Sequence, residues 1–435
     1  MSVVYLVHCI DTEGPLDEGW PTTALRGRSY EPGHYDATAY AAGPWTEIAR
    51  HRKRTLGSWD LIASMVRHVT APKFRAQMTD SFGGSWIYNW FCMDHLGFVD
   101  NPRGRDMGMH RIFDFYSTLL NEQSFGDAIH WHFHSATTYA EANKCGMSYL
   151  NSPFLREIIA RRLLDRKWFP VANRAGFQDE RPDSHWFLEQ WIPFDLSNTS
   201  TDDIDPIHNP DLVNWRFSDW RGAPIDWSTY HPDHDYHQLV GRCRRKVARC
   251  LNLLNRFGNL TKAELEKGFR RAADGVPTLV AFCSHDWRDF APEVDYVRSL
   301  LNVVTPQFPE VRFKFAEARE AFNAVHPPIA QEPLMLACML RSGSEGGKVL
   351  SVRTVKGRVF GPQPFLAVQT RSQRIINDNF GFGDDYREWR YVFDDHSVLP
   401  DDIRRIAIGA NDDAGNQSIH LLDLSEPRQT SEILF

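Results

Sequence analysis

Residues 3 to 13 read VVYLVHCIDTE, an apolar run rich in β-branched side chains that ends in two carboxylates. A continuous apolar run of this length is typical of a parallel strand that is buried on both faces. We therefore predict a strand over Val3 to Ile10, followed by a polar loop that begins at Asp11.

The chain up to about residue 325 alternates between segments with helical spacing and short apolar runs. Helices are predicted over 58–66, 112–120, 154–164, 184–191, 294–303 and 316–324, with two more inside 239–274. Further strands are predicted over 73–78, 128–134, 168–172, 192–196, 278–284 and 311–315. This order indicates an α/β fold with a parallel sheet, either open or closed into a barrel.

The pattern changes after the double proline Pro327-Pro328. Short apolar runs separated by Gly, Asp and Asn clusters now follow one another, at 334–340, 349–355, 365–368, 389–393, 403–408 and 419–422. Such spacing is typical of an all-β sandwich. We predict two domains, 1–327 and 328–435, and expect the loops 342–347 and 411–416 of the second to lie on the surface.

Composition limits the classes of function. Hydrophobic residues make up 42% and charged residues 24% of the 435 residues, which argues against a largely disordered chain. The 49 Lys and Arg against 56 Asp and Glu give a formal net charge of -7, so nothing attracts nucleic acid or an anionic membrane over long range. We expect neither as a partner. The 14 Trp and 18 His are suggestive, because indoles often stack on sugars and imidazoles are common metal ligands.

Cysteine usage and the N-terminus both favour a cytoplasmic location. The seven cysteines are scattered, odd in number and never spaced as CxxC, so neither a disulfide framework nor a zinc ribbon is indicated. The N-terminal MSVVYLVHCIDTEG lacks the positive region of a signal peptide, and no stretch approaches the length of a membrane span.

Two carboxylates follow the first predicted strand. Asp11 and Glu13 are two residues apart, so in an extended chain their side chains point the same way. The carboxyl end of a barrel strand is where active sites form, and these groups could supply a metal ligand and a neighbouring general base. The alternative is that they only hydrogen-bond a loop or cap a helix.

Three histidines alternate at the end of another predicted strand. His130, His132 and His134 share one face of the strand, so two of them could bind a cation with a carboxylate as third ligand. That arrangement leaves a position for water. A core face would rarely carry three imidazoles, because each buried ring needs hydrogen-bond partners.

Three more polar groups leave later strands. Arg174 could orient and stabilise a carboxylate base, although a lone Arg is more often in a surface ion pair. Asp195 is a weaker candidate. His285 could serve as a general acid, with Asp286 beside it as its orienting group, or could be merely structural.

The order of these five groups resembles the motif layout of the polysaccharide deacetylase family of metal-dependent carbohydrate esterases. The resemblance covers roughly residues 1 to 325 and has a divergent first motif. It implies a distorted (β/α) barrel of seven or eight units, with a divalent metal, Zn²⁺ in the first instance, held by one carboxylate and two histidines. It also implies a catalytic Asp base, an Arg that orients it and a late His acid.

Carried over residue by residue, the resemblance makes Asp11 the base and Glu13 the metal ligand. Here a Glu replaces the family's Asp and one residue is inserted between the two, so the two roles could also be exchanged. Among the histidines it favours His132 with His134, whereas the family's i, i+4 spacing fits His130 with His134. The remaining catalytic positions map onto Arg174, Asp195 and His285.

These roles imply a metal-dependent hydrolase that removes an acyl group, most simply acetyl, from an N-acylated sugar or polysaccharide. One alternative is a glycan-binding protein with a structural metal, and another is a related amide or glycosidic hydrolase on the same barrel. The aromatic insertions 14–51 and 82–98, which include Trp86 and Trp90, could wall a substrate groove or simply pack among themselves.

Overall fold

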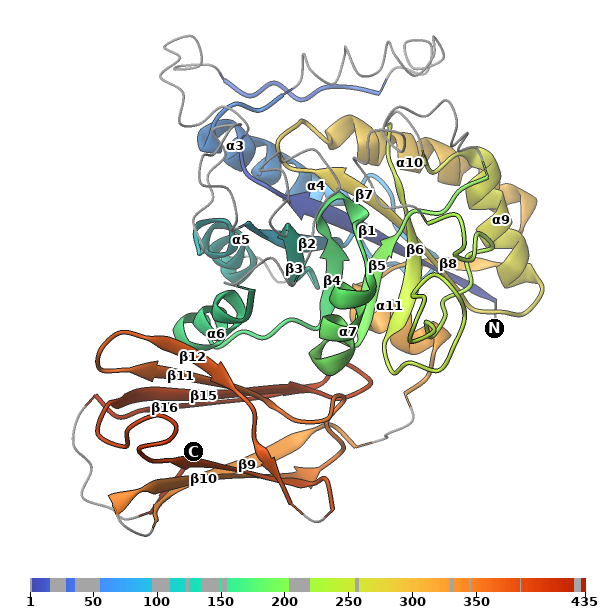
Figure 1. Ribbon diagram of the computed structural model, residues 1–435. Coiled ribbons are helices and arrows are strands. Elements are labelled where there is room, and N and C mark those ends of the chain that lie inside the picture. The colour runs from blue at the N-terminus through green and yellow to red at the C-terminus, as the bar shows by residue number, and fades with distance from the viewer. Residues whose placement is uncertain are drawn as a thin grey trace.

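The computed structural model of this chain describes residues 2–15, 29–35, 55–95, 110–122, 125–134, 149, 155–202, 220–254, 258–328, 332–343, 346–383, 385–425 and 432–435. Parallel strands and helices make up the part up to residue 325, and antiparallel strands make up the part from residue 335 onward (Figure 1). The position of a domain boundary between residues 327 and 328 stays a prediction.

Seven parallel strands close into a barrel. They are β1 (Val3–Thr12), β2 (Tyr88–His95), β3 (Ala128–His134), β4 (Ala172–Ala175), β5 (Phe194–Asn198), β6 (Lys246–Asn252) and β7 (Thr278–His285). The ring closes because β1 pairs with β7 on one side and with β2 on the other. An eighth strand, β8 (Arg312–Phe315), pairs with the first half of β1, and β2 pairs with its second half. The predicted (β/α) barrel is confirmed.

Helices follow most of the strands, and all of them except α11 pack around the ring (Figure 1). They are α3 (Trp59–Thr70), α4 (Pro72–Arg75), α5 (Arg111–Glu122), α6 (Leu155–Arg166), α7 (Pro182–Trp191), α9 (Lys262–Ala273), α10 (Ala291–Val304) and α11 (Ala318–Val325). Helix α3 begins as its sequence predicts, with Ser58 accepting a hydrogen bond from the Leu61 N–H. Six predicted helices are found, as α3, α5, α6, α7, α10 and α11.

Helix α11 fills the barrel end opposite to Asp11. Its Ala318 and Phe322 belong to the same buried cluster as Val7 and Phe194 from the barrel interior, and the rings of Phe194 and Phe322 stack at 4.7 Å. The open end of the barrel is therefore the one at which the parallel strands finish.

Some predicted elements are wrong. Residues 73–78 form α4 and a turn rather than a strand, because Pro72 starts a helical turn that buries Phe74. The region 239–274 contains strand β6 and one helix, not two helices. Strand β6 is hard to detect because it carries charge: Arg249 is buried in an ion pair with Glu264 at 2.5 Å.

Strand β2 escaped sequence reasoning and changes the interpretation of the aromatic insertion 82–98. Trp86 and Trp90 are fully buried in the core between the strands and the surrounding helices, so they do not wall a groove. The other insertion, 14–51, lies mostly outside the described residues. Strand β4 begins at Ala172, later than the predicted 168–172.

The C-terminal part is a sandwich of two antiparallel sheets, as predicted. One sheet has the order β13-β14-β10-β9-β17 and the other β12-β11-β15-β16. Their strands are β9 (Met335–Ser342), β10 (Lys348–Lys356), β11 (Phe365–Thr370), β12 (Ile375–Asp378), β13 (Gly381–Phe382), β14 (Glu388–Phe393), β15 (Ile403–Asn411), β16 (Gln417–Asp423) and β17 (Glu432–Leu434). Leu350 and Trp389 of one sheet pack with Val368 and Ile406 of the other.

The sandwich is docked on the barrel through the loop that was expected on the surface. Asn411 and Asp412 are buried, and the Asn411 amide donates to the carbonyls of Pro170 and Trp191 at 2.8 and 2.7 Å. Arg405 also pairs with Asp165 of the barrel at 2.6 Å. The expectation for 411–416 is wrong, because the polar atoms that suggested a solvated loop bind barrel carbonyls and the loop's own backbone.

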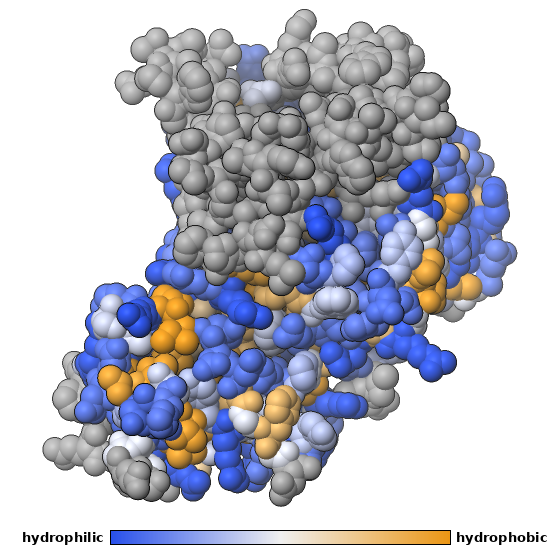
Figure 2. Space-filling view, in the orientation of Figure 1, coloured by the Kyte–Doolittle hydropathy of each residue, from blue (hydrophilic) through white to orange (hydrophobic). Residues whose placement is uncertain are grey.

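The described residues on the face in Figure 2 are mostly hydrophilic. Figure 2 shows hydrophobic residues only in small separate patches on this face of the described residues. Within the described part of the chain, no helix is long and apolar enough to cross a bilayer.

The Asn411 contact gives a first prediction. Asn411→Ala should lower the free energy of unfolding by about 1–3 kcal/mol, because two buried carbonyls lose their donor. Chemical denaturation of the full chain measures the change. Asn302→Ala, on the exposed side of α10, is the matched control and should change it by less than about 0.5 kcal/mol. Equal losses in both variants would contradict the docking contact.

Candidate metal centre at the carboxyl end of the barrel

The alternation of β1 determines which of its polar residues enter the barrel. Val7 and Cys9 face the interior, so Asp11 continues the same face. Thr12 between the carboxylates points elsewhere, and its hydroxyl donates to the Phe91 carbonyl at 3.1 Å. The predicted common direction of Asp11 and Glu13 is consistent with their shared neighbour, because His285 Nε2 lies 3.7 Å from Asp11 Oδ2 and 3.8 Å from Glu13 Oε1.

Glu13, His132 and His134 form a group that could hold a metal ion. One ligand atom from each lies within 4.8 Å of the others, and all three residues are buried. The two imidazole Nε2 atoms are 2.9 Å apart, and Glu13 Oε1 is 4.0 Å from His132 and 3.8 Å from His134. Tetrahedral ligation at about 2.1 Å separates ligand atoms by about 3.4 Å, which lies inside this range. One carboxylate and two imidazoles fit zinc.

The backbone of β4 sets the tautomer of His132. Its Nδ1 lies 2.7 Å from the Arg174 carbonyl, which can only accept a hydrogen bond, so Nδ1 carries the proton. The Nε2 lone pair is then left facing Glu13 and His134. A histidine fixed in this way through its other nitrogen is the usual support of a metal ligand.

The position of the His134 ring depends on Gly176. A Cβ atom added at Gly176 would lie 2.5 Å from Cγ of the imidazole. Phe177 closes the other side, with its ring centroid 4.8 Å from that of His134. The R-x-G sequence at the end of β4 therefore positions both histidines. The Arg174 carbonyl binds His132, and the absence of a side chain at Gly176 leaves room for His134.

Arg174 and Asp11 form a buried ion pair. The guanidinium Nε donates to both carboxylate oxygens at 2.9 and 3.0 Å, and Nη1 donates to the Leu196 carbonyl at 2.9 Å. Burial alone raises the pKa of Asp11, but the charges of Arg174 and nearby imidazoles outweigh it and leave that pKa below its usual value. Asp11 is thus held as a carboxylate, in the orientation predicted for a base.

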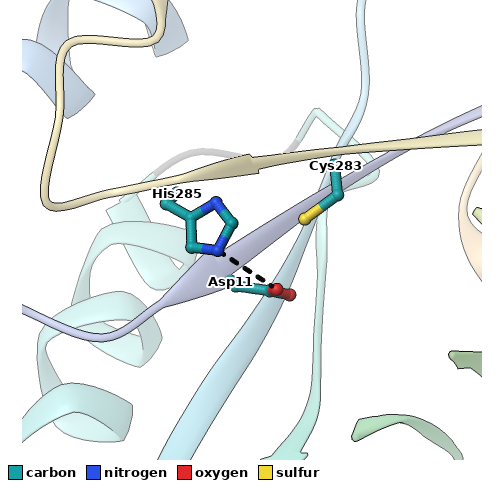
Figure 3. A group of neighbouring side chains, drawn as sticks. All are labelled: Asp11, Cys283 and His285. Atoms are coloured by element: carbon teal, nitrogen blue, oxygen red, sulfur yellow. Dashed lines mark ion pairs between the residues drawn. The ribbon is translucent and has the colours of Figure 1, made fainter. Parts of the chain in front are cut away.

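A second group with metal-ligand chemistry consists of Asp11, Cys283 and His285 (Figure 3). Two features disfavour a cation here. The Arg174 charge already neutralises Asp11, and burial raises the pKa of the Cys283 thiol well above its usual value, so the thiol stays neutral. The carboxylate and imidazole of this group are suited to moving a proton instead.

His285 is the member of the site with an exposed edge. Its side chain is 15% exposed. Burial, with the nearby charge of Arg288 second, lowers the pKa of His285 to about 4. The free imidazole is therefore neutral near pH 7 and can take up a proton that is delivered to it.

Two predicted residues do not join the group. His130 lies on the same strand face but nearer the closed end, where its Nε2 is 3.1 Å from Glu317 Oε1. Asp195 lies on the outer face of β5, because Phe194 and Leu196 on either side of it face the interior.

The surroundings of Asp195 explain its burial. It accepts from Asn173 Nδ2 at 2.7 Å and lies 3.4 Å from Arg245 Nη1. Burial and the charge of Glu180 raise the pKa of Asp195 to about 7. The structure gives it no contact with Asp11.

Asp286 does not orient His285, which was one of the two roles considered for this pair. The His285 Nδ1 atom has no hydrogen-bond partner among the described residues. The Asp286 carboxylate instead accepts from the Tyr116 hydroxyl and from the backbone after Asp11. Tyr116 was missed, because nothing in the sequence of α5 distinguishes it from a core aromatic.

A buried Ser–His pair lies beside the site, but its hydrogen bond runs from the histidine to the serine, which is the wrong direction to activate a serine nucleophile. His8 Nε2 is 2.9 Å from Ser284 Oγ, but Trp86 Nε1 donates to His8 Nδ1 at 3.1 Å. The proton of the neutral ring therefore sits on Nε2 and points at the serine, so His8 cannot accept the serine proton.

Comparisons of the chain with protein-family models, with curated proteins and with solved structures find no match. What the geometry defines is a parallel β/α barrel with buried carboxylate and imidazole groups that could hold a metal ion. The resemblance to deacetylases continues to depend on the order of the motifs.

The contact at Gly176 gives a second prediction. Gly176→Ala should weaken Zn²⁺ binding roughly 10- to 100-fold, because the new methyl group displaces a ligand ring. Competition with a chromophoric chelator measures the affinity. Gly268→Ala is the matched control: its Cβ would crowd Val280 Cγ2 at 2.6 Å, between α9 and β7, and should leave the affinity unchanged. Unchanged affinity in Gly176→Ala would argue against His134 as a ligand.

Proposed function

We propose that this protein is a metal-dependent hydrolase that removes an acyl group, most simply acetyl, from an N-acylated sugar or polysaccharide. One observation carries the proposal: a carboxylate–imidazole set suited to a cation and a separate carboxylate–imidazole pair suited to proton transfer meet at the open end of the barrel. The order of the sequence motifs supports acyl transfer from nitrogen as the reaction.

The chain's own residues divide the work of amide hydrolysis. Zn²⁺ held by Glu13, His132 and His134 would supply a Lewis acid that polarises the amide carbonyl. Asp11 takes a proton from the attacking water while Arg174 holds its carboxylate in place. Asp11 passes this proton to the neutral imidazole of His285, whose Nε2 lies 3.7 Å from Asp11 Oδ2. His285 then delivers the same proton to the amine nitrogen as the C–N bond breaks.

Two further features support a carbohydrate substrate. The Trp287 ring lies 5.5 Å from that of His285 and is only half-buried, so it could stack on a sugar ring beside the acid. The net charge of -7 disfavours a polyanionic substrate. We further propose a cytoplasmic location, which is supported by free thiols at the six cysteines of the described residues.

Acetate release tests the proposed function. The Zn²⁺-loaded protein should release acetate from N-acetylglucosamine oligomers, lose this activity after chelation and regain it when Zn²⁺ is restored. Acetate production and metal content are measured on the same samples. A protein that keeps the metal and binds the oligomers without releasing acetate would favour the non-catalytic glycan-binding alternative, and cleavage of another amide or glycosidic bond would favour the related hydrolase.

Two histidine variants separate metal binding from proton transfer. His134→Ala should lose the metal, because one of three protein ligands is removed. His285→Ala should keep the metal and lose about 10²- to 10⁴-fold in kcat, the usual contribution of a general acid. Metal content and rate are measured together. His130→Asn, changed on the same strand face, is the control and should retain the metal; metal loss there but not in His134→Ala would reassign the ligand.

A further inference from the structure

We infer that Asp286, together with Tyr116, is a positioning residue that sets Glu13 as a metal ligand. The inference rests on the proposed metal centre. It concerns what holds the Glu13 carboxylate, two residues beyond Asp11, at the proposed metal centre.

The Asp286 carboxylate is fully buried and receives hydrogen bonds from three directions. Its Oδ1 accepts from the Glu13 N–H at 2.7 Å. Its Oδ2 accepts from the Gly14 N–H at 3.1 Å and from the Tyr116 hydroxyl at 2.9 Å. The carboxylate therefore links the end of β1 to helix α5.

The register of the sheet explains why a side chain is needed there. Strands β1 and β7 pair as far as Asp11 and His285, and the Asp286 N–H donates to the Asp11 carbonyl at 3.3 Å. After His285 the chain of β7 turns away from the sheet. The Asp286 carboxylate takes the place of the missing strand as acceptor for the next two N–H groups of β1.

The bonds to Asp286 determine where the Glu13 side chain lies. The bond from its N–H to Asp286 holds the Glu13 backbone beside the end of β7, and its Oε1 lies 3.8 Å from His285 Nε2, the atom that is 3.7 Å from Asp11 Oδ2. Gly14 then turns the chain at φ 70°, close against Trp59, where a Cβ would lie 2.9 Å from the ring. The backbone on both sides of the Glu13 side chain is thus held.

The position of Tyr116 adds a second anchor. Its ring is fully buried and stacks on Trp90 of β2 at 4.8 Å, so the hydroxyl is held by the core. Because this hydroxyl holds the Asp286 carboxylate in place, movement of Glu13 away from the site would break the bonds from the Glu13 and Gly14 N–H groups to Asp286. Glu13 thus has a support of its own, separate from the Arg174 contact that holds Asp11.

Asp286→Asn tests the inference, because an amide replaces one acceptor oxygen with a donor that faces N–H or O–H groups. Zn²⁺ affinity should fall 10- to 100-fold, and kcat at saturating Zn²⁺ should return to within a few-fold of the unchanged chain. Tyr116→Phe removes one of the bonds without adding a donor, so it should weaken binding in the same direction by less. Chelator competition on the full chain gives the affinities.

Asp80→Asn is the matched control. Asp80 is also a buried carboxylate that accepts backbone N–H groups, from Phe82, Gly84 and Phe315, but it lies outside the proposed site. It should lower thermal stability without changing the affinity. Should Asp286→Asn fail to fold, Tyr116→Phe decides alone.

The outcomes separate the inference from the proposed function. Unchanged Zn²⁺ affinity in Asp286→Asn, or in Tyr116→Phe when the first variant does not fold, overturns the inference alone. Two results overturn the proposed metal centre and the inference with it. One is that the unchanged chain binds no Zn²⁺, and the other is that the Glu13→Gln variant binds Zn²⁺ as tightly as the unchanged chain does.

Discussion

The interaction on which the rest of the site depends is the buried contact of Arg174 with Asp11. The same residue reaches four strands: its guanidinium binds Asp11 on β1 and the Leu196 carbonyl on β5, and its own carbonyl on β4 binds His132 on β3. Removal of one partner of such a buried pair typically costs about 3–5 kcal/mol, because the other charge is left unpaired. The orientation of the Asp11 carboxylate and the tautomer of His132 are therefore coupled through one residue.

That charge also divides the open end of the barrel into two chemical regions. The Arg174 guanidinium makes the vicinity of Asp11 unfavourable for a cation. Glu13 has no such neighbour in its group and faces the imidazole nitrogens of His132 and His134 instead. The two carboxylates are only two residues apart, yet their neighbours give them different electrostatic surroundings. Such differences between like groups are frequent at functional sites.

Buried charge is also why parts of the fold escape sequence reasoning. Strands β2 and β6 carry Asp94 and Arg249, each fully buried and paired with Arg162 and Glu264 from neighbouring helices. A hydrophobicity pattern predicts that such charged residues are exposed. Their ion-pair partners cannot be identified from the pattern, because they lie on other elements of the chain. The same holds for the loop at Asn411, whose polar side chain binds the barrel rather than water.

By itself, the sequence determined the strand over Val3 to Ile10, the parallel sheet with its helices, the antiparallel sandwich and the shared face of His132 and His134. These follow from local periodicity, which each segment carries regardless of its neighbours. The tertiary structure alone decided that His130 and Asp195 lie apart from the group, that Gly176 makes room for the His134 ring and that Asp286 binds the backbone of Glu13. Those facts depend on which strand ends meet when the ring closes, and that closure brings together residues up to some 270 positions apart, as in the bond from Glu13 to Asp286.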